Sequence, residues 1–472
     1  MSGSFPEGPP PAPRDVLRDL LAGVALRPAL AEAVTLTGRE PVLPSSFAVG
    51  TVAQATIAAA ATAAAELWRL RGGGPQEIAV DMQHAALEYR SERLYQVDGK
   101  PSARLWDAIA GTYRCGDGRW VRIHTNFPHH HDGILDLLGC ADAREAVQAA
   151  LDGWQADVFE DAVAERGLVA TMMRGPEDWL ATPQGAALAE QPLVALERIG
   201  DAPPRPLTPA ARPLEGLRVL DLTRIIAGPV CGRTLAAHGA EVLRIASPRL
   251  PFIAPLVIDT GRGKFSAHLD LEEAEGHETL NALLSDADVF VQGYRPGAIA
   301  GLGFSPSQAA ARRPGIVYVS LSAYGYAGPW AERRGFDSLV QTASGINHAE
   351  AEAFGIVGPK ELPCQALDHA SGYLMALGAI AALKRRAEEG GSWHVRVSLA
   401  RSGRWLQGLG RIAGGPACAA PDAAAIGLFL EQSDSAFGRL AAVRHAAQMS
   451  ATPARWAQPA VPLGSHPPRW PS

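Results

Sequence analysis

The sequence predicts an α/β protein whose larger part is a doubly wound parallel sheet. Three observations favour this fold. Short apolar segments that are typical of buried strands alternate with helical patterns after residue 213, a proline-rich stretch precedes them, and glycine-bearing loops follow several of the strands. Ligands of such sheets bind beyond the carboxyl ends of the strands, so we expect a binding site at these loops.

The proline-rich stretch covers residues 201–213 and cannot continue a helix or join the interior of a sheet. We therefore expect a domain boundary near residue 210. The predicted division is a partly disordered lead segment over residues 1–44, a first half over 45–210 and a second half over 211–472.

The elements of the second half follow from the period of the apolar residues and from the positions of proline. Strands are predicted at residues 217–222, 241–246, 288–292 and 316–321. Helices are predicted at residues 229–238, where proline stands near the start, at 271–285 and at 305–312. The first strand, helix and second strand make a βαβ unit.

A nicotinamide-dependent enzyme is a competing function for such a sheet. The turn after the first predicted strand lacks Gly-x-Gly-x-x-Gly and holds Ala227, Gly228 and Pro229 instead. Proline removes one backbone N–H that would face a phosphate. We therefore discount dinucleotide binding.

One carboxylate near the start of a long helical run is the candidate for chemistry. Asp368 precedes a series of small and apolar residues, and the run ends at Lys384, Arg385 and Arg386. An acid at the positive end of a helix is expected to have a lowered pKa and to stay ionised. Asp is also a favoured N-cap residue, so plain capping is the alternative role of this side chain.

Composition excludes several classes of partner. The 472 residues are 47% hydrophobic and 19% charged, as in a soluble globular protein of more than one domain. The net charge of −6, with no basic cluster interleaved with aromatics, argues against nucleic acid. No apolar stretch is expected to reach the length of a membrane span, since the alanine-rich run over 53–65 contains Gln54, Thr56 and Thr62. The start lacks the pattern of a signal peptide, so we expect a cytoplasmic protein.

Metal and disulfide chemistry are not expected either. The five cysteines are scattered and include no Cys-x-x-Cys pair. The consecutive His129, His130 and His131 point in different directions on a helix or strand, and no suitably spaced acid or cysteine completes a site. We expect no metal and no permanently bound cofactor.

The second half resembles the family III CoA-transferases, which include formyl-CoA transferase and carnitine CoA-transferase and whose fold also serves the α-methylacyl-CoA racemases. The resemblance rests on an ordered set of segments at 213–223, 227–229, 239–242, 263–271, 288–291, 295–298, 302–304, 320–329, 335–337 and 368–386. It implies a Rossmann-like sheet for CoA binding and a smaller α/β domain.

The resemblance also implies a mechanism with Asp368 as the nucleophile. In that family the carboxylate attacks an acyl-CoA thioester to give a mixed anhydride, the thiolate returns to form an aspartyl-CoA thioester, and a free carboxylic acid collects CoA by the reverse steps. CoA is then a substrate, and the partners are an acyl-CoA and a carboxylic acid. The implied CoA contacts are Ile226, Ala227, Leu269, Asp270, Leu271, Gly293, Tyr294, Arg295, Ala323, Tyr324 and Gly325.

Two departures from the family pattern matter. Basic residues that help to hold CoA in the formyl-CoA enzyme are replaced here by Gly301 and Ser322, so the phosphates need other partners. The candidates are Arg224, Arg249, Lys264 and Arg295. The racemases have a histidine directly before the acid that matches Asp337, where this chain has Phe336, which cannot move a proton.

Two further functions stay open beside CoA transfer. One is an acyl-CoA racemase or isomerase in which His369 or Asp337 moves the proton. The other is a non-catalytic CoA-binding protein.

An internal repeat connects the two halves. Residues 52–82 parallel residues 368–399, and Val52 falls opposite Asp368, so the first copy lacks the nucleophile. Residues 116–139 and 154–192 resemble the family's small domain, which usually follows the nucleophile. The sequence thus predicts a fused, rearranged chain with a degenerate first half. Relatives form interlocked dimers, so a homodimer is expected.

Overall fold

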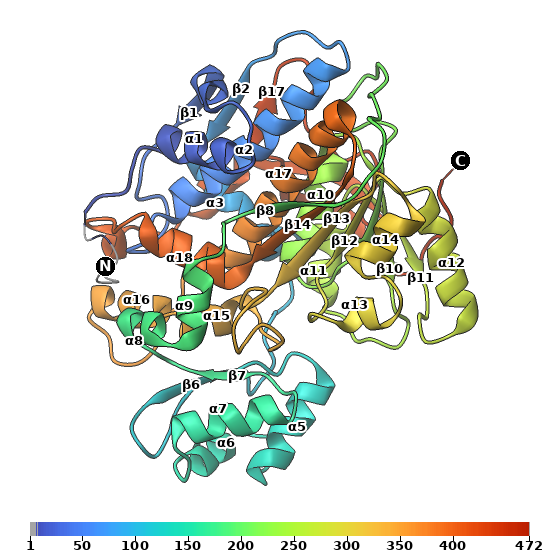
Figure 1. Cartoon of the computed structure of the whole chain (residues 1–472). Coiled ribbons are helices and arrows are strands. Elements are labelled where there is room, and N and C mark those ends of the chain that lie inside the picture. Colours follow the sequence, from blue (N-terminus) through green and yellow to red (C-terminus); the bar gives the residue numbers. More distant parts are fainter. Residues whose placement is uncertain (1–5, 7, 472) are drawn as a thin grey trace.

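The computed structural model describes residues 6 and 8–471. Its largest sheet has seven strands and lies in the larger part of the molecule (Figure 1). The strand order is β11-β10-β9-β12-β13-β14-β8, and all neighbours are parallel except β14 and β8. The bounds are β8 Ala195–Gly200, β9 Arg218–Leu222, β10 Glu241–Ala246, β11 Lys264–His268, β12 Val289–Gln292, β13 Val317–Ser322 and β14 Ser392–Ser398. The prediction of an α/β fold with a parallel sheet is confirmed, and its Rossmann-like double winding stays a prediction.

The four predicted strands of the second half are all present, each within one residue of its predicted bounds. The predicted helix at 271–285 begins later, at Ala274, because a turn closed by Glu273 N–H on the Asp270 carbonyl comes first. The helices of this half are α10 Ala227–Ala237, α11 Ala254–Thr260, α12 Ala274–Ser285, α13 Ala298–Gly301, α14 Pro306–Arg312, α15 Asp337–Ala343, α16 Ile346–Phe354, α17 Ala366–Glu389, α18 Leu399–Gly408, η2 Gly415–Ala417 and α19 Ala423–Gly427.

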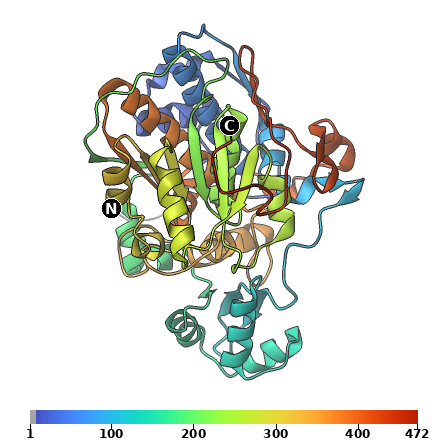
Figure 2. The ribbon, with the colours of Figure 1, turned by 90° about the vertical axis from the view of Figure 1, so that its right-hand side faces the viewer.

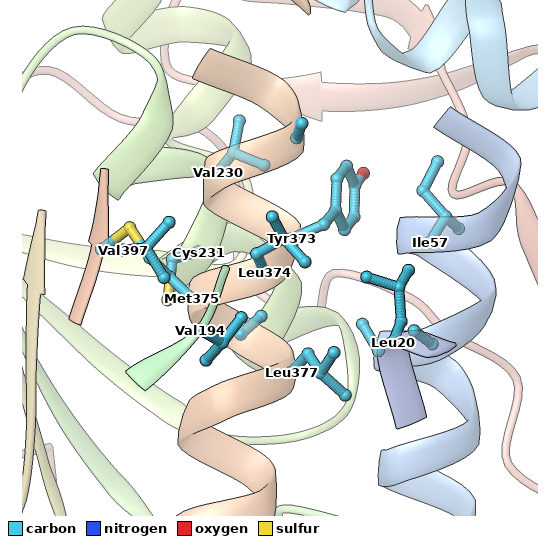
Figure 3. Packing of buried hydrophobic residues seen from close by; sticks show 14 of the residues in the cluster. Leu20, Ile57, Val194, Val230, Cys231, Tyr373, Leu374, Met375, Leu377 and Val397 are labelled. Carbon is cyan, nitrogen blue, oxygen red and sulfur yellow. The ribbon is translucent and has the colours of Figure 1, made fainter. Parts of the chain in front are cut away.

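Helix α17 forms the centre of the hydrophobic core. Its apolar side chains meet α10 on one side and the N-terminal helices on another (Figure 3). A buried leucine such as Leu377 stabilises the fold by roughly 1.5–3 kcal/mol relative to an exposed one. The residues that gather around it include Leu20, Ile57, Val194, Val230, Cys231 and Val397.

The length and composition of α17 would also suit a membrane span. The expectation that no stretch reaches that length is therefore wrong on these two criteria. The whole of its most apolar window is buried inside the fold, as in the core helix of a globular domain.

A glycine lets α17 touch α10. A Cβ atom at Gly372 would lie 2.6 Å from the carbonyl oxygen of Ala227 and 2.7 Å from the Cβ of Val230. Because no side chain fits there, the start of α10 can lie beside the first turns of α17, which carry Asp368.

The first half repeats part of this arrangement. Strands β1 (Val34–Thr37) and β2 (Ile78–Asp81) are parallel and are joined through α2 (Val49–Leu70), as β13 and β14 are joined through α17. Helices α2 and α17 pack against each other. The neighbouring elements are α1 Pro13–Gly23, η1 Pro28–Ala33, α3 Met82–Glu88, α4 Ser91–Leu94, β3 Gln96–Val97 and β4 Lys100–Pro101. Where the predicted disorder of the lead segment falls on residues 1–5 and 7, it lies outside the described residues.

The two halves exchange strands. Strand β8 comes from the first half and pairs antiparallel with β14, whereas β17 (Ala447–Met449) comes from the end of the second half and pairs antiparallel with β2 (Figure 1). Strands β15 (Leu430–Ser435) and β16 (Gly438–Val443) likewise extend the sheet of β3 and β4. Each half therefore completes a sheet of the other.

A small α/β unit projects from one end of the molecule (Figures 1 and 2). Its antiparallel sheet has the order β5-β6-β7 and its core is separate from that of α17. The elements of this part of the chain are β5 Gly111–Arg114, β6 Trp120–Ile123, α5 Pro128–Leu138, α6 Arg144–Leu151, α7 Ala156–Glu165, β7 Ala170–Met172, α8 Pro176–Ala181 and α9 Pro183–Ala189.

Candidate functional site

Asp368 is the third residue of α17, and only 6% of its surface is exposed. Within the described residues its carboxylate has no hydrogen-bond partner, although its backbone N–H has one. The N-cap residue of the helix is Gln365, and its side chain makes no capping hydrogen bond. The alternative that Asp368 acts as the helix cap is therefore wrong, because its carboxylate accepts no hydrogen bond from the backbone of the described residues.

The first turn of α17 is capped by a different acid. Asp337, the first residue of α15, directs its Oδ2 atom at the backbone nitrogens of Leu367 (2.8 Å) and Asp368 (2.9 Å). Its other oxygen accepts a hydrogen bond from the side-chain amide of Gln341. The positive end of the helix is thus occupied by Asp337.

Burial raises the pKa of Asp368 well above its usual range, and the carboxylates of Asp337 and Glu92 raise it further. The expected lowering is wrong, because the N–H groups at the helix end bind Asp337 while Asp368 only loses its water. Burial also raises the pKa of Asp337, to about 6, against the opposing effect of its hydrogen bonds. The two acids titrate as a pair.

The first half supplies the other groups at this helix end. The Oε2 atom of Glu92 in α4 lies 3.1 Å from Nε2 of His369. The next residue, Arg93, donates to the side-chain oxygen of Gln365 at 2.9 Å. Residues of the degenerate half therefore contact the helix turn that carries Asp368.

The loop between β9 and α10 is strained at one residue. Ile225 has a φ of 72°, a left-handed conformation that is rare for a β-branched residue. Such outliers persist only where the surrounding structure imposes them, and they gather at functional sites. Ile225 lines a cavity of about 260 Å³ at the carboxyl ends of the strands.

This cavity lies between the large sheet and the small unit. Phe127, His129 and His130 of the small unit face the loops of the large sheet across it. The guanidinium of Arg224 lies 4.8 Å from the centre of the Phe127 ring and joins the two sides. Further lining residues are Leu250, Gly293, Tyr294, Arg295, Pro296, Ala298, Leu321, Ser322, Ala323, Arg333, Arg334, Gly335, Phe336 and Leu399.

The predicted CoA contacts are partly gathered at this cavity. Gly293, Tyr294, Arg295 and Ala323 line it. Ile226 and Ala227 are buried where α10 begins, directly after the lining residue Ile225.

The other predicted contacts lie away from the cavity lining. Leu269 is buried and Leu271 packs against the same apolar cluster, while Asp270 accepts a hydrogen bond from Arg249. Tyr324 is buried, with its ring 5.1 Å from that of Trp330, and Gly325 stands close to Gln191.

The four candidate phosphate ligands have different surroundings. Lys264 is fully buried and paired with Asp221 at 2.6 Å, so it supports the fold. Arg249 is half exposed and contacts three acids of one loop. Arg224 and Arg295 line the cavity, as do two residues that the sequence analysis missed, Arg333 and Arg334. Their signal was their position directly before Gly335, Phe336 and Asp337.

Two neutral histidines surround the position that carries a histidine in racemases. The His124 ring stacks on Phe336 with centroids 4.0 Å apart, and that of His130 lies 6.5 Å away. Burial lowers the pKa of both His124 and His130 to about 3. His131 instead pairs with Asp132 and Asp142, and within residues 6 and 8–471 no group of three or more His, Cys, Asp or Glu side chains could hold a metal ion.

The chain matches the sequence model described as CoA-transferase family III over residues 25–202 and 214–410. It is 32% identical to an acyl-CoA transferase of Gibberella moniliformis, over 71% of this chain and 66% of that protein. It is 28% identical to an acetyl-coenzyme A transferase of Hypoxylon pulicicidum, over 72% and 65%. The match thus spans slightly less than two thirds of these relatives' length.

A crystal structure of a hypothetical protein from Mycobacterium tuberculosis is 33% identical to this chain. The match covers 42% of this chain and 58% of that chain and gives a TM-score of 0.39.

The family match covers both halves of the repeat and most of the chain. This chain belongs to the family III CoA-transferases.

Proposed function

We propose that this protein transfers CoA from an acyl-CoA thioester to a free carboxylic acid, with Asp368 as the covalent nucleophile. The observation that carries the proposal is the position of the Asp368 carboxylate. It is buried in the first turn of α17 and has no hydrogen-bond partner in the described part of the chain. A structural carboxylate would be paired, since an unpaired buried acid destabilises the fold. Family membership supplies the reaction class.

The reaction follows from the chemistry of a carboxylate. An oxygen of Asp368 bonds to the acyl carbon, the carbon–sulfur bond breaks, and CoA leaves as a thiolate. The thiolate then attacks the Asp368 carbonyl carbon of the mixed anhydride and releases the donor acid. The acceptor acid attacks the aspartyl-CoA thioester, and the same two steps run in reverse. No water takes part, so the energy of the thioester is conserved.

We assign the CoA contacts to the loops around the cavity, with Gly293, Tyr294, Arg295 and Ala323 in its wall. Arg224, Arg295, Arg333 and Arg334 provide positive charge there, which suits the phosphates of CoA or the carboxylate of an acid substrate. We propose a role for Ile226, Ala227, Leu269, Asp270, Leu271, Tyr324 and Gly325 from the family resemblance alone.

The racemase alternative receives less support from the structure. Phe336 has no proton to move, and the pKa of about 3 at His124 and His130 makes both poor bases at neutral pH. The two candidates for the proton transfer are engaged elsewhere, since Nε2 of His369 contacts Glu92 and both oxygens of Asp337 accept hydrogen bonds. A cytoplasmic location and a homodimer remain proposals. Light scattering decides the second, because a homodimer has twice the 49.6 kDa of one chain.

The test is to incubate the protein with a panel of acyl-CoA thioesters, trap with hydroxylamine or borohydride, and map the modified peptide by mass. We expect an adduct confined to Asp368, and none in Asp368→Asn. The matched control is Asp142→Asn, which removes an exposed acid of the small unit and should keep the adduct. Exchange of deuterium at the α-carbon without an adduct would indicate an isomerase. CoA binding with neither result would indicate a non-catalytic protein.

A further inference from the structure

Glu92 is an acid that the proposed reaction does not use, although it lies at the helix end that carries the nucleophile. It belongs to α4 in the first half, and its side chain is completely buried. A buried carboxylate in a half that lacks a counterpart of Asp368 requires an explanation.

The contacts of Glu92 point to the first turn of α17. An ionised carboxylate can only accept, so Nε2 of His369 carries the hydrogen in their 3.1 Å contact. The Oε1 atom of Glu92 lies 3.1 Å from Nε of Arg93, whose guanidinium also reaches Gln365. Glu92 and Arg93 thus contact His369 and Gln365, the two residues that flank residues 366–368.

The charged groups around these acids come from four elements. The charges of Asp337 of α15 and Glu92 of α4 both raise the pKa of Asp368. The charged or titratable groups that act on Glu92 are His369 of α17, Arg93 of α4 and Asp259 of α11. Asp259 is itself paired with Arg233 and Arg262. Burial acts to raise the pKa of Glu92, but the hydrogen bond from His369 and the charge of Arg93 outweigh it, so the pKa is lowered.

We propose that Glu92 is a positioning residue for the transfer reaction: through His369 it fixes the first turn of α17, and its negative charge makes Asp368 more reactive toward the thioester. This inference rests on the proposed function.

The physical reason is the change of charge during the reaction. When Asp368 becomes a mixed anhydride or a thioester, its negative charge leaves with the thiolate or with the released acid. The repulsion between Asp368 and the fixed charge of Glu92 then disappears. The ionised carboxylate of Asp368 in the free enzyme is therefore destabilised relative to its covalent forms, which favours its attack on the thioester. The half without a nucleophile thus contributes to catalysis at the other half's acid.

The test is Glu92→Gln, which keeps the size and an acceptor oxygen but removes the charge. We expect the acidic limb of the pH profile of kcat/KM to move down by about one pH unit, because removal of a like charge lowers the pKa of Asp368. We also expect kcat on the plateau to fall by up to about tenfold, because a less basic carboxylate attacks more slowly. Lower kcat together with an extended acidic range distinguishes this role from a loss of packing.

Glu88→Gln is the matched control. Glu88 is also buried in the first half and also contacts α17, through the hydroxyl of Tyr373 at 2.6 Å, further along the helix than Asp368. We expect this variant to lose stability and to keep the acidic limb of the wild type. An equal shift in both variants, or none in Glu92→Gln, overturns the proposal.

An infrared titration makes the outcome independent of activity. The carboxyl band of Asp368, isolated by subtracting the spectrum of Asp368→Asn, is followed against pH in the wild type and in Glu92→Gln. We expect a midpoint well above that of an ordinary aspartic acid in the wild type and a lower one in the variant. If the wild type forms no adduct but the midpoints differ, the transfer function fails and the electrostatic effect of Glu92 stands. If Glu92→Gln does not fold, an ordinary midpoint in the wild type alone overturns the proposal.

Discussion

The Oδ2 atom of Asp337 lies 2.9 Å from the backbone nitrogen of Asp368, and this hydrogen bond joins the two acids of the site. The same oxygen accepts the N–H of Leu367 at 2.8 Å. Asp337 therefore receives the stabilisation that a helix end offers to a negative charge, and Asp368 does not. Burial and the charges of Asp337 and Glu92 instead raise the pKa of Asp368, so its ionised form is destabilised.

Asp368→Asn should make the protein more stable at neutral pH while abolishing transfer. The folded-state pKa of Asp368 lies above the unfolded value near 3.9, so its stabilising effect is complete below about pH 4 and is lost as pH rises through the folded pKa. Asparagine cannot ionise and avoids this loss. Thermal unfolding between pH 5 and 8.5 should show a gain on the order of a few degrees that grows with pH. Equal midpoints at every pH would contradict the raised pKa.

Asp337→Asn should simplify the pH dependence of transfer. Burial raises the pKa of Asp337 to about 6, and in the wild type the pair loses its protons in two steps that belong to both acids. Asparagine leaves one acid and removes the repulsion between the two, so we expect a single acidic limb that lies below the upper step of the wild type. The measurement is kcat/KM against pH. Two steps in the variant would assign the second ionisation to another group.

Ile225→Gly should change stability little but weaken CoA binding. Glycine relieves the left-handed strain at φ 72°, which offsets part of the lost apolar contact, and it also frees the loop before α10. Its neighbour Ile226 is buried with a φ of −123°, so Ile226→Gly should cost about 2–4 kcal/mol. Denaturant unfolding and calorimetric titration with CoA compare the two. Equal losses of stability in both variants would remove the case for strain.

Lys264→Met should destabilise the fold by about 3–5 kcal/mol, because it leaves Asp221 buried without its partner 2.6 Å away. The control is Arg249→Met, which breaks half-exposed ion pairs and should cost less than about 1 kcal/mol. Denaturant unfolding of both variants is the measurement. A small loss in Lys264→Met would return this residue to the candidates for phosphate binding.

Gly372→Ala should destabilise the contact between α10 and α17 by about 1–3 kcal/mol, because the new methyl group would lie 2.6 Å from a backbone oxygen. Gly408, the last residue of α18, has open space around its Cβ position, so Gly408→Ala should stabilise slightly, by at most about 0.5 kcal/mol, through helix propensity. Thermal unfolding gives both signs. Equal behaviour of the two variants would show that the helices can move apart at no cost.

Much of the fold could be predicted, because the relevant signals are local in the sequence. Strand β9 is a short apolar segment ahead of a glycine-bearing loop, and α10 has a proline near its start. Asp368 stood out because it opens a long run of small and apolar residues. The repeat of this pattern in α2 likewise predicted a second copy.

The neighbours of Asp368 could not be predicted in the same way. Glu92 lies 277 residues from its partner His369, and Asp337 lies 31 residues from the nitrogen that it caps. Lys264 looked like a free cation in the sequence, but the fold buries it against Asp221. The exchange of β8 and β17 between the two halves could not be inferred either, because the sequence of an edge strand does not specify which strand it pairs with.

The sequence by itself determined the family, the parallel sheet and the position of the acid at a helix start, because periodicity, proline and motif order are properties of the chain. Only the tertiary structure decided what that acid experiences. Desolvation and repulsion depend on distances between groups that are remote in the chain, and here they reverse the pKa shift that the helix end alone predicts. The degenerate half becomes part of the site for the same reason, since folding brings Glu92 to the helix turn of Asp368.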